Sequence, residues 1–474
     1  MQNLEQHYLH YRERLSAVGQ EHVLRFWSTL TPEQKRQLLN QLAKLQIEQL
    51  AEQAELIKGR RQSAAVCLEG LQPYPAIPVP QSEAKRQQHR ESAHVGVELL
   101  RQGKVAVLVV AGGLGTRLGS DEPKGTLAIG PVSGRSLFQF HSEKVVRLGS
   151  RYGRPLHFLL MTSESNHSRT ELFFQQHRFF GLERSRVTFF SQSSQPAFDN
   201  QGRILLNAPH SLALSPDGHG GLLRALQRDQ IIERLMQDGV EYLYYFQVDN
   251  VLSRIADPVF LGFHVLHGSE MSSKSVAKRN ADEKVGVFCL CDGQAVVKEY
   301  SEFPTELRQQ QESDGRLRFR EGSIAIHIFS LAFLQRLQQS GITLPYHVAH
   351  KKVPCIDDQG QLQEPGAENG YKLEQFIFDA LPHARASMVM QTSREDEFSP
   401  VKNNEGVDSP ATARQAMCDL FGRWVEQAGG SVLRDSQQHV AVNLEVRPLF
   451  SLDADEFAAR VPHGIRISSD HLFE

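Results

Sequence analysis

Residues 104–119 read KVAVLVVAGGLGTRLG, and this stretch predicts the fold. Its first half, KVAVLVV, is continuously apolar and rich in β-branched residues, which is typical of a parallel strand buried on both faces. Its second half is a glycine-rich turn, and glycines let backbone N–H groups approach an anion closely. A buried strand that runs directly into such a turn indicates an α/β domain whose ligand binds at the carboxyl edge of the sheet.

Further apolar runs and helical segments alternate after this strand, in the order β-α-β-α. That order predicts a Rossmann-like α/β fold with a mostly parallel sheet. The expected strands cover residues 156–161, 187–190 and 242–248, and the expected helices cover residues 136–148, 168–177 and 222–237.

The two ends of the chain have a different character. Thr31, Pro32 and Gln34 read as N-cap, N1 proline and capping-box residue of an amphipathic helix, and a proline-rich strap follows at residues 73–80. After residue 393 a polar loop leads to an expected helix at residues 411–429. We therefore expect three parts, which are a helical N-terminal region with the strap (1–95), an α/β domain (96–392) and a small C-terminal domain (393–474).

Composition narrows the classes of function. The 474 residues contain 52 Lys and Arg against 55 Asp and Glu, a net charge of −3, which argues against a general nucleic-acid binder. The five cysteines are odd in number and include no CxxC pair, which suits a reducing compartment without a disulfide framework. The start is polar, and no run of about 18 apolar residues occurs. We expect a cytoplasmic protein without nucleic-acid or membrane partners, either monomer or homodimer.

The glycine-rich turn matches neither standard phosphate motif. The P-loop requires Gly-Lys followed by Ser or Thr, and the dinucleotide fingerprint requires G-x-G-x-x-G, whereas AGGLGTRLG is followed by PKG at residues 123–125. Arg117 and Lys124 add positive charge for an anion. A glycine-rich turn alone is weak support, because tight turns often need glycine for structural reasons.

The whole string is more specific. AGGLGTRLG followed by PKG resembles the signature of sugar-nucleotide pyrophosphorylases, and four further stretches resemble, in order and spacing, the eukaryotic-type UDP-N-acetylhexosamine pyrophosphorylases of the UDPGP type 1 family. These stretches are LSPDGHGG (214–221), QVDN (247–250), EYSE (299–302) and REDEFSPVKN (394–403). The resemblance covers roughly residues 20–430 and makes residues 96–392 the expected nucleotidyltransferase catalytic domain.

The resemblance implies a uridylyltransferase that makes a UDP-sugar and pyrophosphate from UTP and a sugar-1-phosphate, with N-acetylglucosamine-1-phosphate as the expected acceptor. It gives the catalytic charges to Arg117, Lys124 and Lys402, and uracil and ribose recognition to Gln192 and the 216–221 loop. His219 stands where these enzymes usually carry Asn. The implied nucleotide contacts are Ala111, Gly112, Gly113, Gly115, Thr116, Gln192, Pro216, Gly218, His219 and Asp249.

Two of these residues also have a simpler interpretation. Asp249 ends the buried run YLYYFQVD, where a carboxylate can hold Mg²⁺ together with substrate phosphates or can merely cap a turn. Lys402 lies in a polar loop and would otherwise be taken as a solvated lysine. The motifs around both residues favour function, with Asp249 as the metal ligand and Mg²⁺ as the cofactor.

The sugar pocket is implied on the same resemblance. For the two phenylalanines that it includes, core packing is an almost equal alternative. Ser323 and Ile326 stand where the N-acetylhexosamine enzymes typically carry asparagines, which weakens the assignment of the N-acetyl sugar. His347 and His350 are interpreted as structural. The implied sugar-binding residues are Gly286, Glu299, Tyr300, Ser323, Phe376 and Phe378.

The expected reaction needs no nucleophilic side chain, because a sugar phosphate with a second pKa of about 6 is already largely dianionic near neutral pH. It needs two aligned anions and neutralised charge. The alternatives are a glucose-1-phosphate or other hexose-1-phosphate acceptor, a non-catalytic nucleotide-binding regulator, and an NAD-dependent enzyme. The complete set of charges argues against the regulator, and the glycine spacing argues against NAD.

Overall fold

The computed structural model describes residues 2–59 and 70–474, and these residues form two compact units. The first unit combines residues 2–59 with Gln192–Leu222 and Thr343–Asp379. The second combines residues 70–191 with Leu223–Ile342 and Ala380–Glu474. Both units are discontinuous in sequence, whereas the expected division at residues 95 and 392 is consecutive and stays a prediction.

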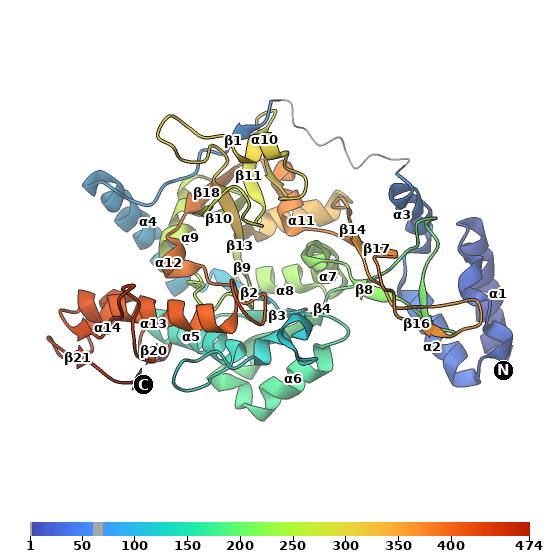
Figure 1. Ribbon diagram of the computed structural model, residues 1–474, viewed down its shortest axis with the longest axis horizontal. Coiled ribbons are helices and arrows are strands. Elements are labelled where there is room, and N and C mark those ends of the chain that lie inside the picture. Colours follow the sequence, from blue (N-terminus) through green and yellow to red (C-terminus); the bar gives the residue numbers. More distant parts are fainter. Residues whose placement is uncertain (1, 60–69) are drawn as a thin grey trace. The chain divides into compact units, whose positions relative to one another are not determined.

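A ten-stranded sheet lies at the centre of the second unit, within the described residues (Figure 1). Its main path is β1-β11-β13-β9-β2-β3-β4, with β12 paired to β11 and with β10 between β13 and β18. Strands β9, β2, β3 and β4 run parallel, and β13 runs antiparallel to β9. The predicted α/β class is confirmed. The strands are β1 (Gln72–Pro73), β2 (Val105–Val110), β3 (Phe158–Thr162), β4 (Val187–Ser191), β9 (Tyr242–Gln247), β10 (Met271–Ala277), β11 (Val287–Cys291), β12 (Gln294–Lys298), β13 (Glu321–Ser330) and β18 (Ser387–Gln391).

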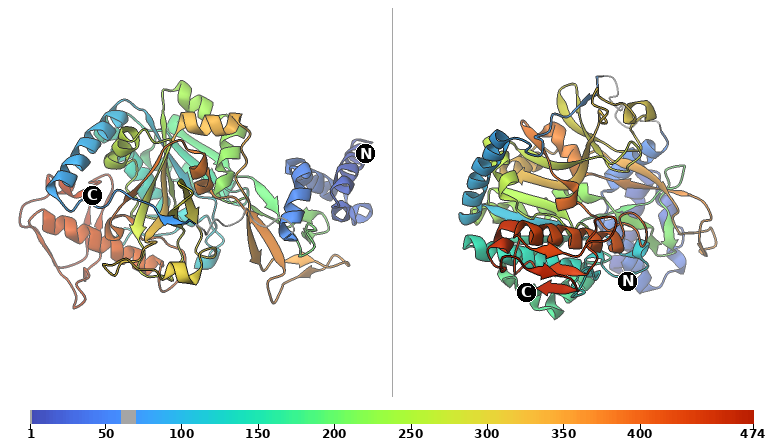
Figure 2. Two further views of the ribbon diagram at one scale, coloured as in Figure 1. Left: turned by 90° about the horizontal axis from the view of Figure 1, so that it is seen from above. Right: turned by 60° about the vertical axis from the view of Figure 1, so that its left-hand side comes forward.

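Helices accompany this sheet, and α4 packs along α9 (Figure 2). The prediction of one helix over residues 222–237 is wrong, because Gln230 takes a left-handed conformation (φ 51°) and separates α7 from α8. The helices are α4 (Glu83–Arg101), α5 (Leu137–Tyr152), α6 (His167–Gln176), α7 (Leu222–Arg228), α8 (Ile231–Gln237), α9 (Pro258–Leu266), α10 (Thr305–Arg308), α11 (Leu331–Gln339), α12 (Arg394–Glu397), α13 (Pro410–Gln427) and α14 (Ala454–Ala458).

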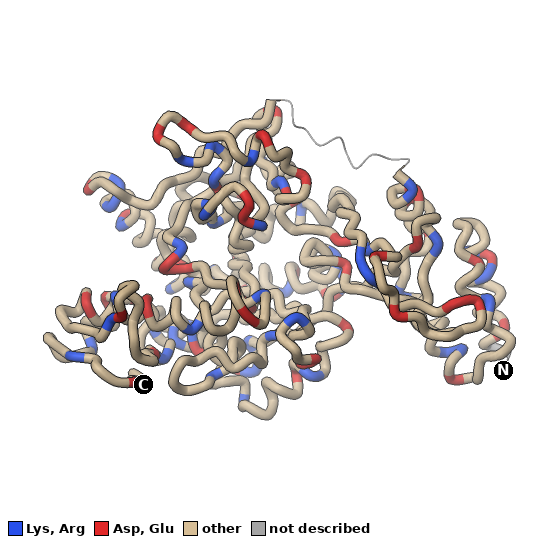
Figure 3. The backbone as a smooth tube through the Cα atoms, viewed as in Figure 1, with Lys and Arg blue, Asp and Glu red and all other residues tan. Residues whose placement is uncertain are grey.

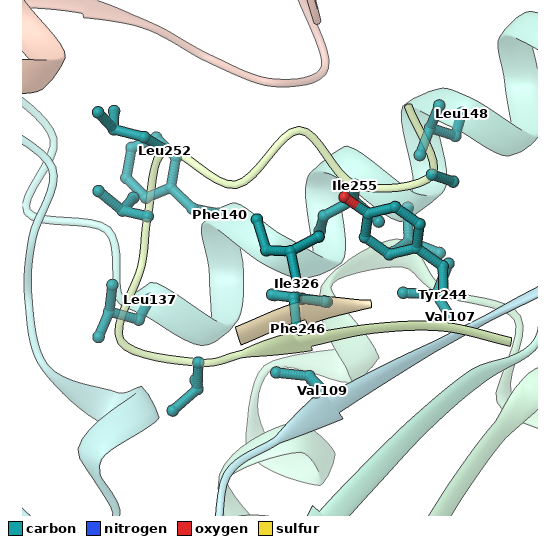
Figure 4. Close-up of a cluster of buried hydrophobic side chains, with 14 of the residues drawn as sticks. Val107, Val109, Leu137, Phe140, Leu148, Tyr244, Phe246, Leu252, Ile255 and Ile326 are labelled. Carbon is teal, nitrogen blue, oxygen red and sulfur yellow. The ribbon is translucent and has the colours of Figure 1, made fainter. Parts of the chain in front are cut away.

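The main core of the second unit is built on the apolar strands that the sequence singles out. Val107 and Val109 of β2 lie beside Phe246 of β9, and Ile326 of β13 joins the same cluster (Figure 4). All four side chains are 0% exposed. Burying one such side chain is worth about 1.5–3 kcal/mol, which explains why these strands can hold the loops at their ends in place.

The first unit has a helical part and a set of short strands. Thr31 caps α2 with the predicted capping box, in which the Gln34 N–H donates to Thr31 Oγ1 at 3.3 Å and the Thr31 N–H donates to Gln34 Oε1 at 2.9 Å. The predicted apolar face is buried at Leu38, Leu39 and Leu42. The elements are α1 (Gln2–Ala17), α2 (Pro32–Lys44), α3 (Leu50–Ile57), β5 (Ser194–Pro196), β6 (Leu206–Ala208), β7 (Ser211–Leu212), β8 (Leu214–Pro216), β14 (His347–Lys351), β15 (Cys355–Ile356), β16 (Leu362–Gln363) and β17 (Gly370–Glu374).

The C-terminal segment belongs to the second unit. The helix expected at residues 411–429 is α13, and short strands follow it, namely β19 (Ser431–Val432), β20 (Leu444–Val446), β21 (Arg466–Ile467) and β22 (His471–Phe473). Basic and acidic residues are interspersed along the chain in both units (Figure 3). Among the described residues, no helix combines the length and the apolar character that crossing a membrane requires.

One cysteine departs from the expectation of a chain without disulfide bonds. Cys289, Cys355 and Cys418 are free thiols, whereas Cys291 is disulfide-bonded. Cys67 lies outside the described residues.

Candidate active site

The glycine-rich loop folds back on itself directly after β2. The Gly115 N–H donates to the Glu122 carbonyl at 2.9 Å, and the Lys124 N–H donates to the Gly113 carbonyl at 3.1 Å. Asn166 supports the loop from outside, since its Nδ2 donates to the Ala111 carbonyl at 2.8 Å. The five predicted nucleotide-binding residues of this loop are therefore held together at the carboxyl edge of the sheet. They are Ala111, Gly112, Gly113, Gly115 and Thr116.

Lys124 and Asp249 meet at this edge. Lys124 Nζ donates to Asp249 Oδ2 at 2.8 Å, with the two side chains 18% and 11% exposed. Only a glycine fits directly after the lysine, because a Cβ on Gly125 would lie 2.3 Å from the Phe138 ring. Arg117 lies on the same loop and is exposed. The structure thus brings the predicted lysine and the predicted metal ligand into contact, with a second predicted cation on the loop.

Lys402 is placed beside Asp249 through the backbone. The Val401 N–H donates to the Asp249 carbonyl at 3.0 Å, and Val401 is fully buried. The Lys402 N–H donates to the Asp408 carbonyl at 2.7 Å, and its side chain is partly exposed. Lys402, the third predicted cation, therefore directly follows Val401, which is hydrogen-bonded to the backbone of Asp249.

Three of the predicted sugar-binding residues come together where β11 begins and β12 ends, beside β13. The Ser323 N–H donates to the Gly286 carbonyl at 2.7 Å, and a Cβ on Gly286 would lie 3.0 Å from Glu299 Oε1. Tyr300 follows Glu299 and is 38% exposed. Glu299 and Ser323 thus offer a carboxylate and a hydroxyl on either side of a glycine, a suitable pattern for hydrogen bonding to sugar hydroxyls.

Ile326 does not belong to this group. A β-bulge interrupts the pairing of β10 with β13, so that Ser273 faces His327 whereas Ser275 faces Ser323. Ala325 inside the bulge has a φ of 54°. Ser323 is partly exposed, but Ile326 is fully buried among the apolar residues of the core (Figure 4). Ser323 and Ile326 are three residues apart on β13, so strand alternation turns their side chains to opposite faces. Ile326 lies in the apolar core with Ile324 and Ile328, and the two changes therefore lie in different environments.

The remaining predicted residues lie in the first unit, around His219. Its ring stacks on Phe376 with centroids 5.1 Å apart, and Phe378 lies 5.8 Å away. Phe376 is partly exposed, whereas Phe378 is only 6% exposed. Packing is thus an adequate role for Phe378, while Phe376 keeps an accessible edge.

The loop that carries His219 approaches residue 375 closely. The Gly220 N–H donates to the Gln375 carbonyl at 2.7 Å, and a Cβ on Gly218, whose φ is 82°, would lie 2.5 Å from the same oxygen. Pro216 ends β8, and Gln192, 6% exposed, comes just before β5, the strand that pairs with β8. His219 and Phe376 therefore pack together on this loop, and Gln192 precedes the strand that pairs with Pro216.

His219 is neutral near pH 7. Burial, together with a smaller electrostatic contribution from nearby His347, lowers its pKa from 6.5 to about 4. Its Nδ1 accepts a hydrogen bond from the Ile377 N–H at 3.2 Å, which requires an unprotonated nitrogen. His347 contacts Asp379 Oδ2 at 2.8 Å, and His350 stacks on Tyr371.

Sequence reasoning missed a group of buried charges beneath the Lys402 segment. Lys274 Nζ lies 2.7 Å from Asp257 Oδ2 and 2.6 Å from Glu397 Oε1, and all three residues are at most 4% exposed. A lysine among small residues in the strand MSSKSVA was the available signal, because a charge in a buried strand requires a partner.

This arrangement defines a class of protein. A parallel sheet whose first strand leads into a glycine-rich anion loop, with a lysine–aspartate pair at the same edge, is the framework of a nucleotidyltransferase of the α/β type. It supplies fixed charges for phosphates.

Comparison with known proteins gives the family. The model of the UTP–glucose-1-phosphate uridylyltransferase family matches residues 53–467. The human UDP-N-acetylhexosamine pyrophosphorylase-like protein 1 is 39% identical over 442 residues, 89% of this chain and 86% of that protein. The UDP-N-acetylglucosamine pyrophosphorylase of Saccharomyces cerevisiae is 37% identical over 433 residues, 88% of this chain and 90% of that protein. The chain therefore belongs to the UTP–glucose-1-phosphate uridylyltransferase family, and the resemblance seen in its motifs is confirmed.

A solved structure agrees with this conclusion. The crystal structure of the UDP-N-acetylglucosamine pyrophosphorylase from Trypanosoma brucei, in complex with an inhibitor, matches 98% of both chains with a TM-score of 0.80 at 27% identity.

Proposed function

We propose that this chain transfers the uridylyl group of UTP to N-acetylglucosamine-1-phosphate, making UDP-N-acetylglucosamine and pyrophosphate. The observation that carries the proposal is the contact between Lys124 of the anion loop and Asp249 at the end of β9. The yeast and trypanosomal relatives, whose names specify UDP-N-acetylglucosamine, support this acceptor. We further propose a cytoplasmic enzyme that acts on small molecules.

The reaction is a direct in-line transfer. A phosphate oxygen of the sugar phosphate forms a bond to the α-phosphorus of UTP, and the bond from that phosphorus to the bridging oxygen breaks, so that the electron pair leaves with pyrophosphate. The attacking oxygen is already anionic, and no side chain need take up a proton. Arg117, Lys124 and Lys402 align the two anions and stabilise the charge that develops on the α-phosphate and on the leaving group.

Asp249 suits a magnesium ion. Its carboxylate is a hard oxygen donor at the edge of the sheet, and Mg²⁺ is typically held by one or two carboxylates together with substrate phosphates and water. Among the described residues, no group of three or more His, Cys, Asp or Glu side chains could form an all-protein site. A bound Mg²⁺ would neutralise phosphate charge beside Lys124.

We assign recognition of the acceptor and of uracil to separate groups of residues. Glu299 and Ser323, beside Gly286 and Tyr300, contact the sugar hydroxyls. Of the two phenylalanines assigned to the sugar, Phe376 keeps an accessible edge, and Phe378 packs beside it with ring centroids 5.1 Å apart. Gln192, Pro216, Gly218 and His219 contact uracil and ribose, since the neutral His219 and the loop backbone can read a pyrimidine edge.

Glucose-1-phosphate is the second candidate acceptor, and Ser323 is the observation that favours it. A hydroxyl at this position reaches less far than the asparagine amide of the N-acetylhexosamine enzymes. The test is pyrophosphate release from UTP with a panel of sugar-1-phosphates at fixed Mg²⁺. We expect the highest kcat/KM for N-acetylglucosamine-1-phosphate. A higher kcat/KM for glucose-1-phosphate would make that sugar phosphate the acceptor instead. No pyrophosphate release with any sugar phosphate would refute the transferase assignment.

A further inference from the structure

Asn250 directly follows Asp249 and holds the segment that leads to Lys402. Its Nδ2 donates to the Glu397 carbonyl at 2.7 Å, and its Oδ1 accepts from the Ser399 N–H at 3.1 Å. The residue is 3% exposed. One amide thus satisfies two backbone groups that lie two residues apart, as a neighbouring strand would.

The backbone continues this pairing up to the lysine. Asn250 forms a β-bridge with Pro400, and the Val401 N–H donates to the Asp249 carbonyl at 3.0 Å. Phe398 and Val401 are buried in the core of the second unit. The segment is therefore anchored along Asp249 and Asn250, and Lys402 is the first residue beyond the anchor.

Glu397 is held at its side chain as well as at its carbonyl. Its carboxylate lies 2.6 and 2.7 Å from Lys274 Nζ and accepts from Thr392 Oγ1 at 2.9 Å. Buried charges of this kind are expensive to desolvate and are often no more stabilising than apolar side chains of equal volume. What the network does provide is one fixed place for Glu397, and hence for the carbonyl that Asn250 binds.

We propose that Asn250 is a positioning residue that sets the place of Lys402 relative to Asp249, an inference that rests on the proposed uridylyl transfer. Asparagine is required because the position needs one donor and one acceptor on the same planar group. Aspartate keeps the acceptor but presents an oxygen to the Glu397 carbonyl, and alanine loses both bonds. A displacement of about 1 Å in a catalytic group can cost about 100-fold in rate.

A double-mutant cycle tests this role. Asn250→Ala is combined with Lys402→Ala, and kcat is measured from pyrophosphate release at saturating UTP and N-acetylglucosamine-1-phosphate. We expect Asn250→Ala alone to lower kcat about 10- to 100-fold. In the Lys402→Ala background it should lower kcat by less than about threefold, because the group that Asn250 positions is already gone.

A residue that only stabilises the fold would behave differently. It would lower activity by the same factor in both backgrounds, and that additive result would overturn the proposal. Asn250→Asp repeats the cycle if the alanine variant does not fold. Asn443→Ala is the control, because Asn443 Nδ2 also ties two segments of this unit, donating to Asp470 Oδ2 at 2.9 Å, and should leave kcat unchanged. Absence of turnover in the unmodified protein would instead refute the transferase assignment itself.

Discussion

Replacing Lys124 by methionine removes a charge from the proposed reaction centre and little else. Methionine keeps an unbranched side chain but lacks the cation that lies 2.8 Å from Asp249 Oδ2. Because the Lys124 side chain is only 18% exposed, water can replace the lost charge only in part. Loss of one preorganised charge or donor from such a site costs about 10²- to 10³-fold in kcat, or about 3–4 kcal/mol of transition-state stabilisation.

The assay is pyrophosphate release from UTP and N-acetylglucosamine-1-phosphate at saturating Mg²⁺, with kcat and KM determined separately. Lys104→Met is the matched control, since Lys104 lies just before β2, at the opposite end of the strand from the anion loop. Its Nζ pairs with Glu241 at 2.9 Å, with side chains 32% and 49% exposed. Exposed pairs contribute about 0–1 kcal/mol, so the control should keep its kcat. If Lys124→Met raises only KM and leaves kcat within about fivefold, the reasoning about Lys124 is refuted.

Three further predictions concern Lys402, Ser323 and His219. Lys402→Ala should lower kcat about 10²- to 10³-fold with an unchanged unfolding temperature, and normal turnover would remove Lys402 from the proposed site. Ser323→Asn should shift the kcat/KM ratio several-fold toward N-acetylglucosamine-1-phosphate over glucose-1-phosphate, the effect of one hydrogen bond worth about 0.5–1.5 kcal/mol, and an unchanged ratio would show that residue 323 does not select the sugar. The pKa of His219 is about 4 in the folded chain and 6.5 as its ordinary value, so the unfolded chain binds the proton first and stability falls as the pH drops from 6.5 toward 4. His219→Asn should therefore lose about 2 kcal/mol less stability than the unmodified protein between pH 7 and pH 5, measured by urea unfolding, and equal losses would contradict the burial of a neutral imidazole.

The sheet could be predicted because each buried strand is marked by a short apolar run in the sequence. A run such as KVAVLVV can bury every side chain only between two layers, and β2 has five of its six residues buried. The break at Gln230 had no such signal, because neither glycine nor proline marks it. The two compact units were also hidden, since pairings such as the Phe198 N–H with the Tyr371 carbonyl join residues far apart in the chain.

The candidate site was likewise predicted in part, with some residues found from the sequence and others missed. Lys124 and Asp249 were found because each lies in a short motif at the end of a strand, where parallel topology brings side chains together. Asn250, Lys274 and Glu397 come from three separate segments, and their contacts exist only once the sheet has formed. Motif reasoning therefore identified the charges proposed to contact substrate but missed the residues that hold them in place.

The alternation of side chains along β13 shows why a departure from a family motif must be interpreted one residue at a time. GSIAIH differs from the family pattern at Ser323 and Ile326, and in sequence the two changes look like one altered pocket. The left-handed Ala325 lies between them, and Ile324 and Ile326 are 4% and 0% exposed in the core, whereas Ser323 bonds to Gly286 beside Glu299. An asparagine at 326 would bury an amide among apolar side chains, where an unsatisfied polar group costs about 1–3 kcal/mol. A change at 323 acts on the proposed sugar contacts, whereas a change at 326 acts on stability, so sugar choice is correctly tested by Ser323→Asn alone.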